Sequence, residues 1–197
     1  MTRKKILILA GAQLCDNPRV PKEAQALSDA GYDVEVTGAL FRPESREVEE
    51  GWRNRSWRYT RIFDATDPAN QSHWKKLRIR RKLGLLMHRW LGIQCGWQLG
   101  YLGPELVSHA KRRQADLTIA HHHETPWVGW KLLQSGMRVG FDVEDWYSED
   151  YLPENKSSTP IRLLKKCEGE LLRRGASTTT TSIALSEGLA KHYGARK

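Results

Sequence analysis

The sequence predicts a single α/β domain with a mostly parallel, doubly wound sheet of six or seven strands and helices on both faces, a three-layer arrangement. Strand-like and helix-like segments alternate along the chain. The first strand-like run, KILILAGA at residues 5–12, is apolar throughout, as expected for a parallel strand that is covered on both faces. The 197 residues, 39% of them hydrophobic, suffice for the core of one domain and not of two.

The opening segment predicts a β-α-β unit. After the strand at residues 5–12, Asp16 and Asn17 are suited to cap a helix, and Gly31 is suited to end it. Residues 32–39 (YDVEVTGA) alternate and include β-branched side chains, which predicts the second strand. Because such crossovers are right-handed and join parallel strands, we expect a parallel sheet.

The remaining elements follow the same alternation. Residues 41–51 form a charged segment that predicts a loop, and residues 57–63 (WRYTRIF) alternate like a strand near a sheet edge. Further strands are predicted at residues 117–122, 138–143 and 177–183, and helices at residues 73–92, 105–113, 124–134, 161–174 and 185–193.

The net charge, hydropathy and cysteine spacing exclude some classes of protein. The formal net charge is +9 and the mean hydropathy is -0.63, and no apolar stretch approaches the roughly 20 residues of a membrane span. The basic, apolar N-terminus lacks a signal-peptide cleavage site, which favours a first strand. Cysteines 15, 95 and 167 form no C-x-x-C pair, which argues against a disulfide scaffold or zinc knuckle and favours a reducing cytoplasm.

Residues 73–92 predict an amphipathic helix that contains seven Lys or Arg residues and no acidic residue. The helical spacing gathers apolar residues on one arc and most cations opposite it. The arc comprises Ile79, Leu83, Leu86, Met87 and Trp90. In one interpretation, this arc packs on the sheet and the cations are solvated. In the other, the helix lies on anionic lipid and contacts it through Arg78, Arg81, Lys82, Arg89 and Trp90.

Three loops that follow predicted strands carry the candidate site, because open parallel sheets bind ligands at the carboxyl ends of their strands. The first contains Gly11, Asn17 and Arg19, the second is His121–Glu124, and the third has six carboxylates between Asp142 and Glu154. Carboxylates beside Trp146 and Tyr147 suit a sugar surface, since acids accept hydroxyl hydrogen bonds and rings stack on pyranose faces.

The same residues also allow other functions. Strand alternation is expected to place His121 and His123 on one side and His122 on the other, which disfavours a three-histidine metal site, although Glu124 or Asp142 could complete another set. Paired carboxylates also suit glycoside hydrolysis. A dinucleotide G-x-G-x-x-G motif is absent after the first strand. A basic nucleic-acid-binding module and a non-catalytic interaction domain are the alternatives; the acidic candidate loop disfavours nucleic acid.

Three sequence blocks resemble glycosyltransferase family 4. DNPRVPKEAQALSDAGYDVEVTG is similar to that family's opening D-P-R-V-x-x-E-A segment, and FDVEDWYSED is similar to its Y-D-x-H-E-x-Y-S-E segment. CEGELLRRGASTTTTSIALSEGLAKHYG resembles its E-x-x-L-L-R-R-A-D segment. The blocks occur in order and span nearly the whole chain, with the middle third least similar. Glu144 and Asp145 stand where the family has a His-Glu pair.

The resemblance implies an architecture and an activity. It implies that residues 1–197 are the N-terminal, Rossmann-like acceptor domain of a GT-B glycosyltransferase, without the C-terminal donor domain and its E-x7-E motif. The implied parent enzyme is a retaining, metal-independent, hexosyltransferase-like transferase of polysaccharide biosynthesis. Its partners would be a nucleotide-sugar and a glycan or lipid-linked acceptor, with no other cofactor. Its place would be the cytoplasm, with peripheral attachment to the inner face of the cell membrane.

The expected site combines the three loops. His123 and Glu124 are the candidates for a catalytic role, and no metal ligand is expected. The residues expected to bind the acceptor are Gly11, Asn17, Arg19, His122, Asp142, Glu144 and Asp145. All should converge at the carboxyl edge of the sheet if their strands are neighbours.

Overall fold

The computed structural model describes residues 3–11, 13–152 and 158–195. Their six-stranded sheet is parallel at every pairing and has the strand order β3-β2-β1-β4-β5-β6. The strands are β1 Lys5–Leu9, β2 Asp33–Leu40, β3 Arg58–Asp64, β4 Leu117–Ala120, β5 Val139–Val143 and β6 Ser177–Thr180. The predicted α/β class and parallel sheet are therefore confirmed. Ala12 and Glu154, which fell in predicted segments, lie outside the described residues.

Helices cover both faces of the sheet because the strands are apolar on both sides. On one face, Val20 and Ala24 of α1 (Arg19–Asp29) pack against Ile6 and Ile8 of β1. On the other face, the intervening Leu7 and Leu9 belong to a core shared with three helices. These are α4 (Gly103–Arg113), α5 (Thr125–Gln134) and α7 (Ile161–Arg174). The three layers confirm the predicted doubly wound arrangement.

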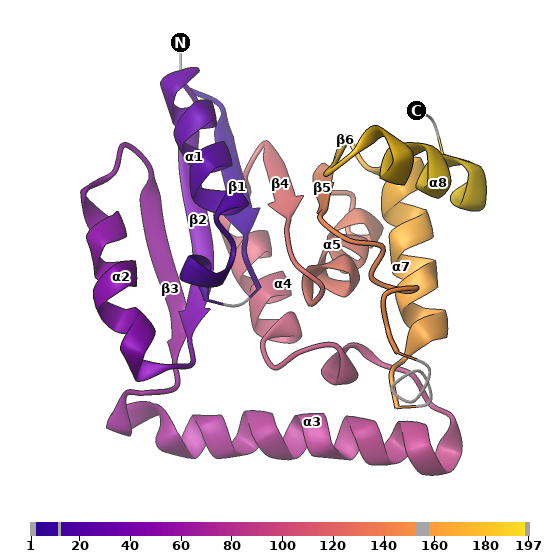
Figure 1. Cartoon of the computed structure of the whole chain (residues 1–197). Helices are drawn as coiled ribbons and strands as arrows, with labels where there is room; N and C mark the ends of the chain where they lie inside the picture. The colour runs from indigo at the N-terminus through magenta and orange to yellow at the C-terminus, as the bar shows by residue number, and fades with distance from the viewer. Residues whose placement is uncertain (1–2, 12, 153–157, 196–197) are drawn as a thin grey trace.

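The long helix α3 (Gln71–Leu91) lies across the sheet rather than along it (Figure 1). It runs on the side toward which the strand arrows point, so it borders the carboxyl edge of the sheet. Leu77 and Gly84 are the buried positions of this helix, and Gln98 ties the following chain to it by donating to the Gly84 carbonyl oxygen at 2.7 Å. The predicted basic helix thus forms one border of the edge where the candidate loops end.

The apolar arc of α3 faces away from the protein. Ile79, Leu83, Leu86 and Trp90 are exposed to 58%, 49%, 48% and 73%, respectively. The interpretation that this arc packs on the sheet is therefore wrong, because the sheet-facing side of the helix is the one that carries Leu77 and Gly84. Within the described residues, no helix is both long and apolar enough to cross a bilayer.

The predicted loop at residues 41–51 is largely helical. It contains a 3-10 turn at Pro43–Ser45, helix α2 (Arg46–Glu50) and the start of a second 3-10 turn at Gly51–Asn54. Glu49 explains the difference, because its buried carboxylate accepts hydrogen bonds from the Leu14 amide at 2.9 Å and the Tyr59 hydroxyl at 2.7 Å. These tertiary contacts hold a segment too short to show helical periodicity.

Some strand and helix boundaries differ from the predicted ones in the loops at the carboxyl edge of the sheet. The strand predicted at residues 117–122 ends at Ala120, and His122 has a left-handed backbone with φ of 77°. The last helix, α8 (Ile183–Tyr193), begins two residues early because the Ser182 side chain accepts a hydrogen bond from the Leu185 amide at 3.1 Å. The predicted strand at 177–183 accordingly ends at Thr180.

Candidate functional site at the carboxyl edge of the sheet

An ion pair joins the first and third candidate loops. Arg19 begins α1, and its Nε and Nη2 atoms lie 2.9 and 2.5 Å from the two carboxylate oxygens of Asp142 in β5. This two-point geometry is the strong form of an arginine–carboxylate contact. Asp142 is 2% exposed, so the pair holds the start of α1 to the end of β5 from inside the protein.

His121 lies at the centre of the same cluster and is 1% exposed. Its Nε2 lies 2.6 Å from Glu23 Oε2, and its Nδ1 lies 3.1 Å from Asp142 Oδ2 and 3.7 Å from Glu144 Oε1. Burial disfavours the charged imidazolium, but the three carboxylates outweigh burial and raise the pKa of His121 to about 10. The ring is therefore protonated at neutral pH.

The carboxylates of this cluster are occupied by partners within the protein. Burial opposes the ionised form of Asp142, but His121, Arg19 and the Thr179 hydroxyl, which donates to it, hold its pKa well below the usual range. The Asn17 amide donates to Glu144, whose pKa is also lowered despite burial. We call Asn17, Arg19, Glu23, His121, Asp142, Glu144 and Thr179 the charge cluster.

The charge cluster has a donor set of the kind that metals use. Ligand atoms of His121, Asp142 and Glu144 lie within 4.8 Å of one another. Without a metal, the imidazole carries a proton and Arg19 pairs with Asp142, so a metal ion would have to displace that proton. The cluster is thus built around the protein's own cations and suits a role in holding loops together.

A second group of predicted residues lies where Gly11 meets the loop after β4. Gly11 has a φ of 73°, and a Cβ there would lie 3.0 Å from Thr125 Cγ2 and 3.5 Å from Glu124 Cβ. The close approach of the two loops therefore requires glycine. Because β4 has already ended, the His122 and His123 rings lie together, with centroids 4.0 Å apart, and the predicted alternation of the three histidines is wrong.

One carboxylate oxygen of Glu124, Oε2, is buried and has no hydrogen-bond partner among the residues that the structure describes. A Cβ on Gly100 would lie 2.4 Å from that atom. Burial raises the pKa of Glu124 to about 7, although the charge of Arg81 opposes the rise. Near neutral pH, this carboxyl group is therefore present in both its protonated and its ionised form.

His123, the residue before Glu124, is neutral at pH 7. Burial, the neighbouring His122 and the charge of Arg81 lower the pKa of His123 to about 4. A neutral imidazole offers one donor and one acceptor nitrogen. Together with Glu124, it supplies groups that can exchange hydrogen bonds with a hydroxyl group and, in the case of Glu124, take up its proton.

The aromatic residues of the acidic loop do not form the predicted sugar platform. Tyr147 is 7% exposed and belongs to the core, and the Trp146 ring packs edge-on against His192 in α8, with ring centroids 5.1 Å apart. Asp145 is exposed. Among the carboxylates of this loop, Asp142 and Glu144 belong to the charge cluster, and Glu149 pairs with Lys165 at 2.6 Å.

The structure sorts the predicted site residues other than Asp145 into two adjacent groups at one edge. Asn17, Arg19, Asp142 and Glu144 share the charge cluster, whereas Gly11, His122, His123 and Glu124 surround the junction with the β4 loop. Glu144 acts electrostatically on His122 and His123, which links the groups.

Sequence reasoning missed His121, Glu23 and Thr179 as parts of the charge cluster and Arg81 as a neighbour of Glu124. The four-residue spacing of Arg19 and Glu23 on one helix was an available signal. The position of Arg81 near Glu124 depends on how α3 crosses the sheet edge, and no local sequence pattern predicts it.

No protein-family model and no curated protein matches the sequence. Solved structures match the fold. A protein described as a UDP-N-acetylglucosamine 2-epimerase from Listeria monocytogenes aligns at a TM-score of 0.55 and 10% identity over 98% of this chain and 43% of that chain. Glycyrrhiza uralensis UGT73P12, complexed with glycyrrhetinic acid 3-O-monoglucuronide, aligns at 0.54 and 13% identity, over 99% and 48%.

Arabidopsis thaliana UGT89C1, complexed with UDP-L-rhamnose, aligns at a TM-score of 0.50 and 10% identity over 92% of this chain and 46% of that chain. The chain thus spans less than half the length of these three structures. At such identities the likeness concerns the fold. Residues 3–195, apart from the undescribed positions, adopt the three-layer α/β fold of a GT-B Rossmann-like domain.

Proposed function

We propose that this chain is the acceptor-side domain of a glycosyltransferase that moves a sugar from a nucleotide-sugar to a glycan or lipid-linked acceptor. The GT-B-like fold supports this proposal, as does the gathering of polar residues at the carboxyl edge, where open parallel sheets bind ligands. Since the chain spans less than half of its structural neighbours, the donor-binding half would lie outside residues 1–197. The three sequence blocks favour family 4 and, with it, a retaining, metal-independent reaction.

The observation that carries this proposal is the buried, unpartnered carboxylate oxygen of Glu124. An acceptor hydroxyl that donated to it would supply the missing partner of a costly buried acceptor. Its pKa of about 7 suits a group that takes up or shares the proton of that hydroxyl near neutral pH. His123, neutral at that pH, would help to orient the same acceptor.

The other predicted residues support this site. Gly11 lets the β1 loop approach Glu124, and the charge cluster holds the ends of β4, β5 and α1 in fixed relation. Because Asp142 is buried and already paired, it acts by positioning Arg19 and His121 and not by touching the acceptor. Arg19 and Asn17 remain at the border of the site.

Calorimetric titration tests this function. Nucleoside diphosphate sugars should bind the 197-residue chain weakly and undergo no transfer, because the proposed donor contacts lie elsewhere. A panel of soluble glycosides and short-chain lipid-linked sugars should include one that binds, with an affinity that falls about tenfold in Glu124→Gln. Glu47→Gln, the same change at an exposed carboxylate of α2, is the control. Micromolar binding of a nucleotide-sugar, or a glycoside affinity independent of Glu124, would contradict the proposal.

The exposed face of α3 supports a peripheral membrane role for the same domain. Ile79, Leu83, Leu86 and Trp90 form an apolar stripe, and Arg89 lies over the Trp90 ring at 5.6 Å. Lys or Arg residues near an anionic surface each contribute about 1 kcal/mol. Arg78, Lys82 and Arg89 are exposed and suited to this contact, whereas Arg81 turns inward to Tyr101.

Co-sedimentation with vesicles tests the membrane role. The protein should sediment with phosphatidylglycerol-containing vesicles at low salt and remain in solution with phosphatidylcholine alone. Leu86→Gln/Trp90→Gln, which changes the exposed stripe, should release it, whereas Val48→Gln, which changes an exposed apolar residue of α2, should not. Equal recovery with both kinds of vesicle would count against this role.

A further inference from the structure

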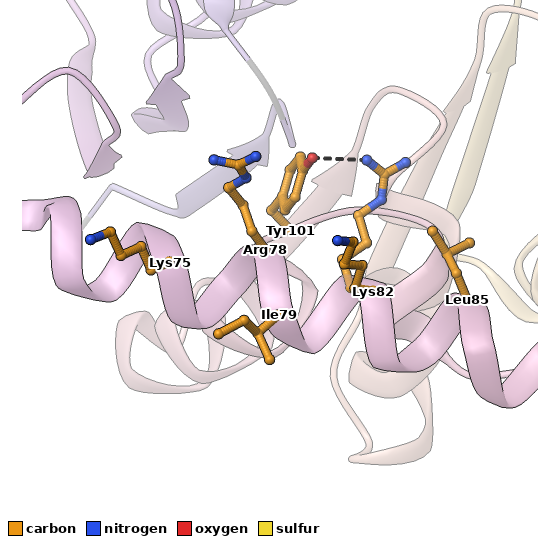
Figure 2. Close-up of a pocket in the computed structure, with 7 residues that line it drawn as sticks. Lys75, Arg78, Ile79, Lys82, Leu85 and Tyr101 are labelled. Carbon is orange, nitrogen blue, oxygen red and sulfur yellow. Dashed lines mark hydrogen bonds between the residues drawn. The ribbon is translucent and has the colours of Figure 1, made fainter.

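A groove of about 400 Å³ lies between α3 and the chain that leads into α4. Its lining is cationic, with one aromatic ring and apolar side chains. The lining consists of Lys75, Arg78, Ile79, Arg81, Lys82, Leu85 and Tyr101. Figure 2 shows Arg78 and Lys82 on the same side of α3 as the Tyr101 ring. The groove adjoins the outward apolar stripe, since Ile79 belongs to both.

The cations of the groove lack acidic partners. Among the residues that the structure describes, no carboxylate lies within 4.0 Å of a charged nitrogen of Lys75, Arg78, Arg81 or Lys82, whereas the adjacent Arg80 pairs with Glu105 at 2.7 Å. Arg81 is held by the protein in another way, since its Nη1 donates to the Tyr101 hydroxyl at 3.0 Å and its guanidinium lies 4.7 Å from the ring centroid. Its Nε is buried and unpartnered among those residues.

Like charges gathered in a concave surface attract anions and repel one another when no anion is bound. Guanidinium and ammonium groups at several angles match the oxygens of a phosphoryl group, and Tyr101 fixes the orientation of Arg81 beforehand. The groove therefore has the chemistry of a phosphate subsite.

The groove is continuous with the candidate site through Arg81 and the Gly100–Tyr101 segment. Arg81 lowers the pKa of His123, after burial and His122, and opposes the rise in the pKa of Glu124. Gly100, next to Tyr101, lies so close to Glu124 that a Cβ would be 2.4 Å from Oε2. The segment that carries Tyr101 therefore also packs against the Glu124 carboxylate.

We propose that this groove binds the phosphate or diphosphate group of the acceptor. The inference rests on the proposed function: a phosphoryl group held by Arg78 and Lys82, with Arg81 between it and Glu124, would direct the hydroxyl of the attached sugar or polyol toward the Glu124 carboxylate. The substrate class is a phosphorylated acceptor, whether a lipid headgroup or a soluble sugar phosphate.

Calorimetry with inorganic pyrophosphate at low salt tests the groove. The double substitution Arg78→Gln/Lys82→Gln should weaken binding about tenfold, because it removes two charged donors. Lys76→Gln/Lys111→Gln changes the net charge equally at exposed positions outside the groove and should change the affinity less than about twofold. Circular dichroism melting curves establish that both variants are folded. Equal weakening in both, or no binding to the unchanged protein, would overturn the proposal.

A competition experiment distinguishes the two sources of phosphate. If pyrophosphate releases the protein from phosphatidic acid vesicles, and does so less effectively in Arg78→Gln/Lys82→Gln, the groove takes a lipid headgroup. If the protein binds pyrophosphate in the groove without leaving the vesicles, the groove takes a soluble phosphate. Since pyrophosphate carries no sugar, its binding is independent of Glu124→Gln, and a failure here is separable from a failure of the proposed function.

Discussion

The charge cluster around His121 and the groove along α3 lie at the same edge of the sheet, but the charges are paired in the cluster and unpaired, among the described residues, in the groove. In the cluster, Arg19 and His121 are matched by three carboxylates from α1 and β5 and the loop that follows it. In the groove, Arg78 and Lys82 have no acidic partner within the described residues. The difference indicates that paired buried charge builds the scaffold, whereas unpaired exposed charge is available to a ligand.

The pair Asp142–Arg19 gives the largest expected effect. Asp142→Asn keeps the shape of the side chain but leaves His121 and Arg19 without their shared counter-charge. Breaking a buried ion pair such as Asp142–His121 costs about 3–5 kcal/mol of unfolding free energy, and the partly exposed Arg19 adds less. Urea denaturation of the variant measures this loss. Asp145→Asn, three residues away and exposed, should change stability by less than about 0.5 kcal/mol. Similar effects of the two substitutions would remove the distinction between cluster and surface.

The raised pKa of His121 predicts a loss of stability at alkaline pH. Below about pH 6.5, the unfolded pKa, both the folded and the unfolded state hold the proton on His121. Above that pH, the unfolded state releases the proton first. The stabilisation therefore falls until the pH passes the folded pKa of about 10. The loss is on the order of 5 kcal/mol. Urea unfolding from pH 6.5 to 10 should show this slope in the unchanged protein and a smaller one in His121→Gln. Identical slopes would show that His121 is not the titrating group.

Unlike the carboxylates of the charge cluster, Glu124 should destabilise the folded state when it is ionised, because its Oε2 is buried without a partner among the described residues. Its folded pKa of about 7 lies above its unfolded value, so folding loses stability as the pH rises from about 4.5 to 7. Glu124→Gln should therefore stabilise the protein by about 1–2 kcal/mol at pH 8 and by much less at pH 5. Thermal unfolding at both pH values measures this, with Glu47→Gln as the control. A destabilised Glu124→Gln at pH 8 would mean that the carboxylate has a structural partner.

The groove gives the smallest expected effect on stability. Arg78→Gln/Lys82→Gln removes two solvated cations that make no ion pair within the described residues, so the unfolding free energy should change by less than about 0.5 kcal/mol. The same variant serves in the phosphate titration, where a large loss of binding is expected. A destabilisation above about 1 kcal/mol, measured by urea denaturation, would place these cations in the scaffold.

Several elements were predictable because their signals are local. Helix α7 (Ile161–Arg174) has the predicted bounds, since its apolar residues repeat at helical spacing and Gly175 follows them. The parallel sheet followed from the apolar run of β1 and the alternation of strands with helices. By contrast, the helical turns at residues 43–54 were missed because they are short and are held by the buried Glu49.

The candidate site was predictable only in outline. Placement of residues after parallel strands brought Asn17 next to Glu144 and Arg19 next to Asp142. The role of His121 was hidden because β4 ends at Ala120 and the backbone turns at His122, which ends strand alternation. The predicted exposure of Tyr147 was wrong because the core covers it, and Trp146 is partly covered by His192 of α8.

By itself, the sequence determined the order of the strands and of the helices other than α2, the parallel sheet and the amphipathic character of residues 73–92. Each of these depends on side-chain periodicity within a few turns or strand residues. Only the tertiary structure decided which charges are paired and which face of α3 is exposed. The physical reason is separation along the chain: Arg19 meets Asp142 across 123 residues, and such pairing depends on how the elements pack rather than on any local pattern.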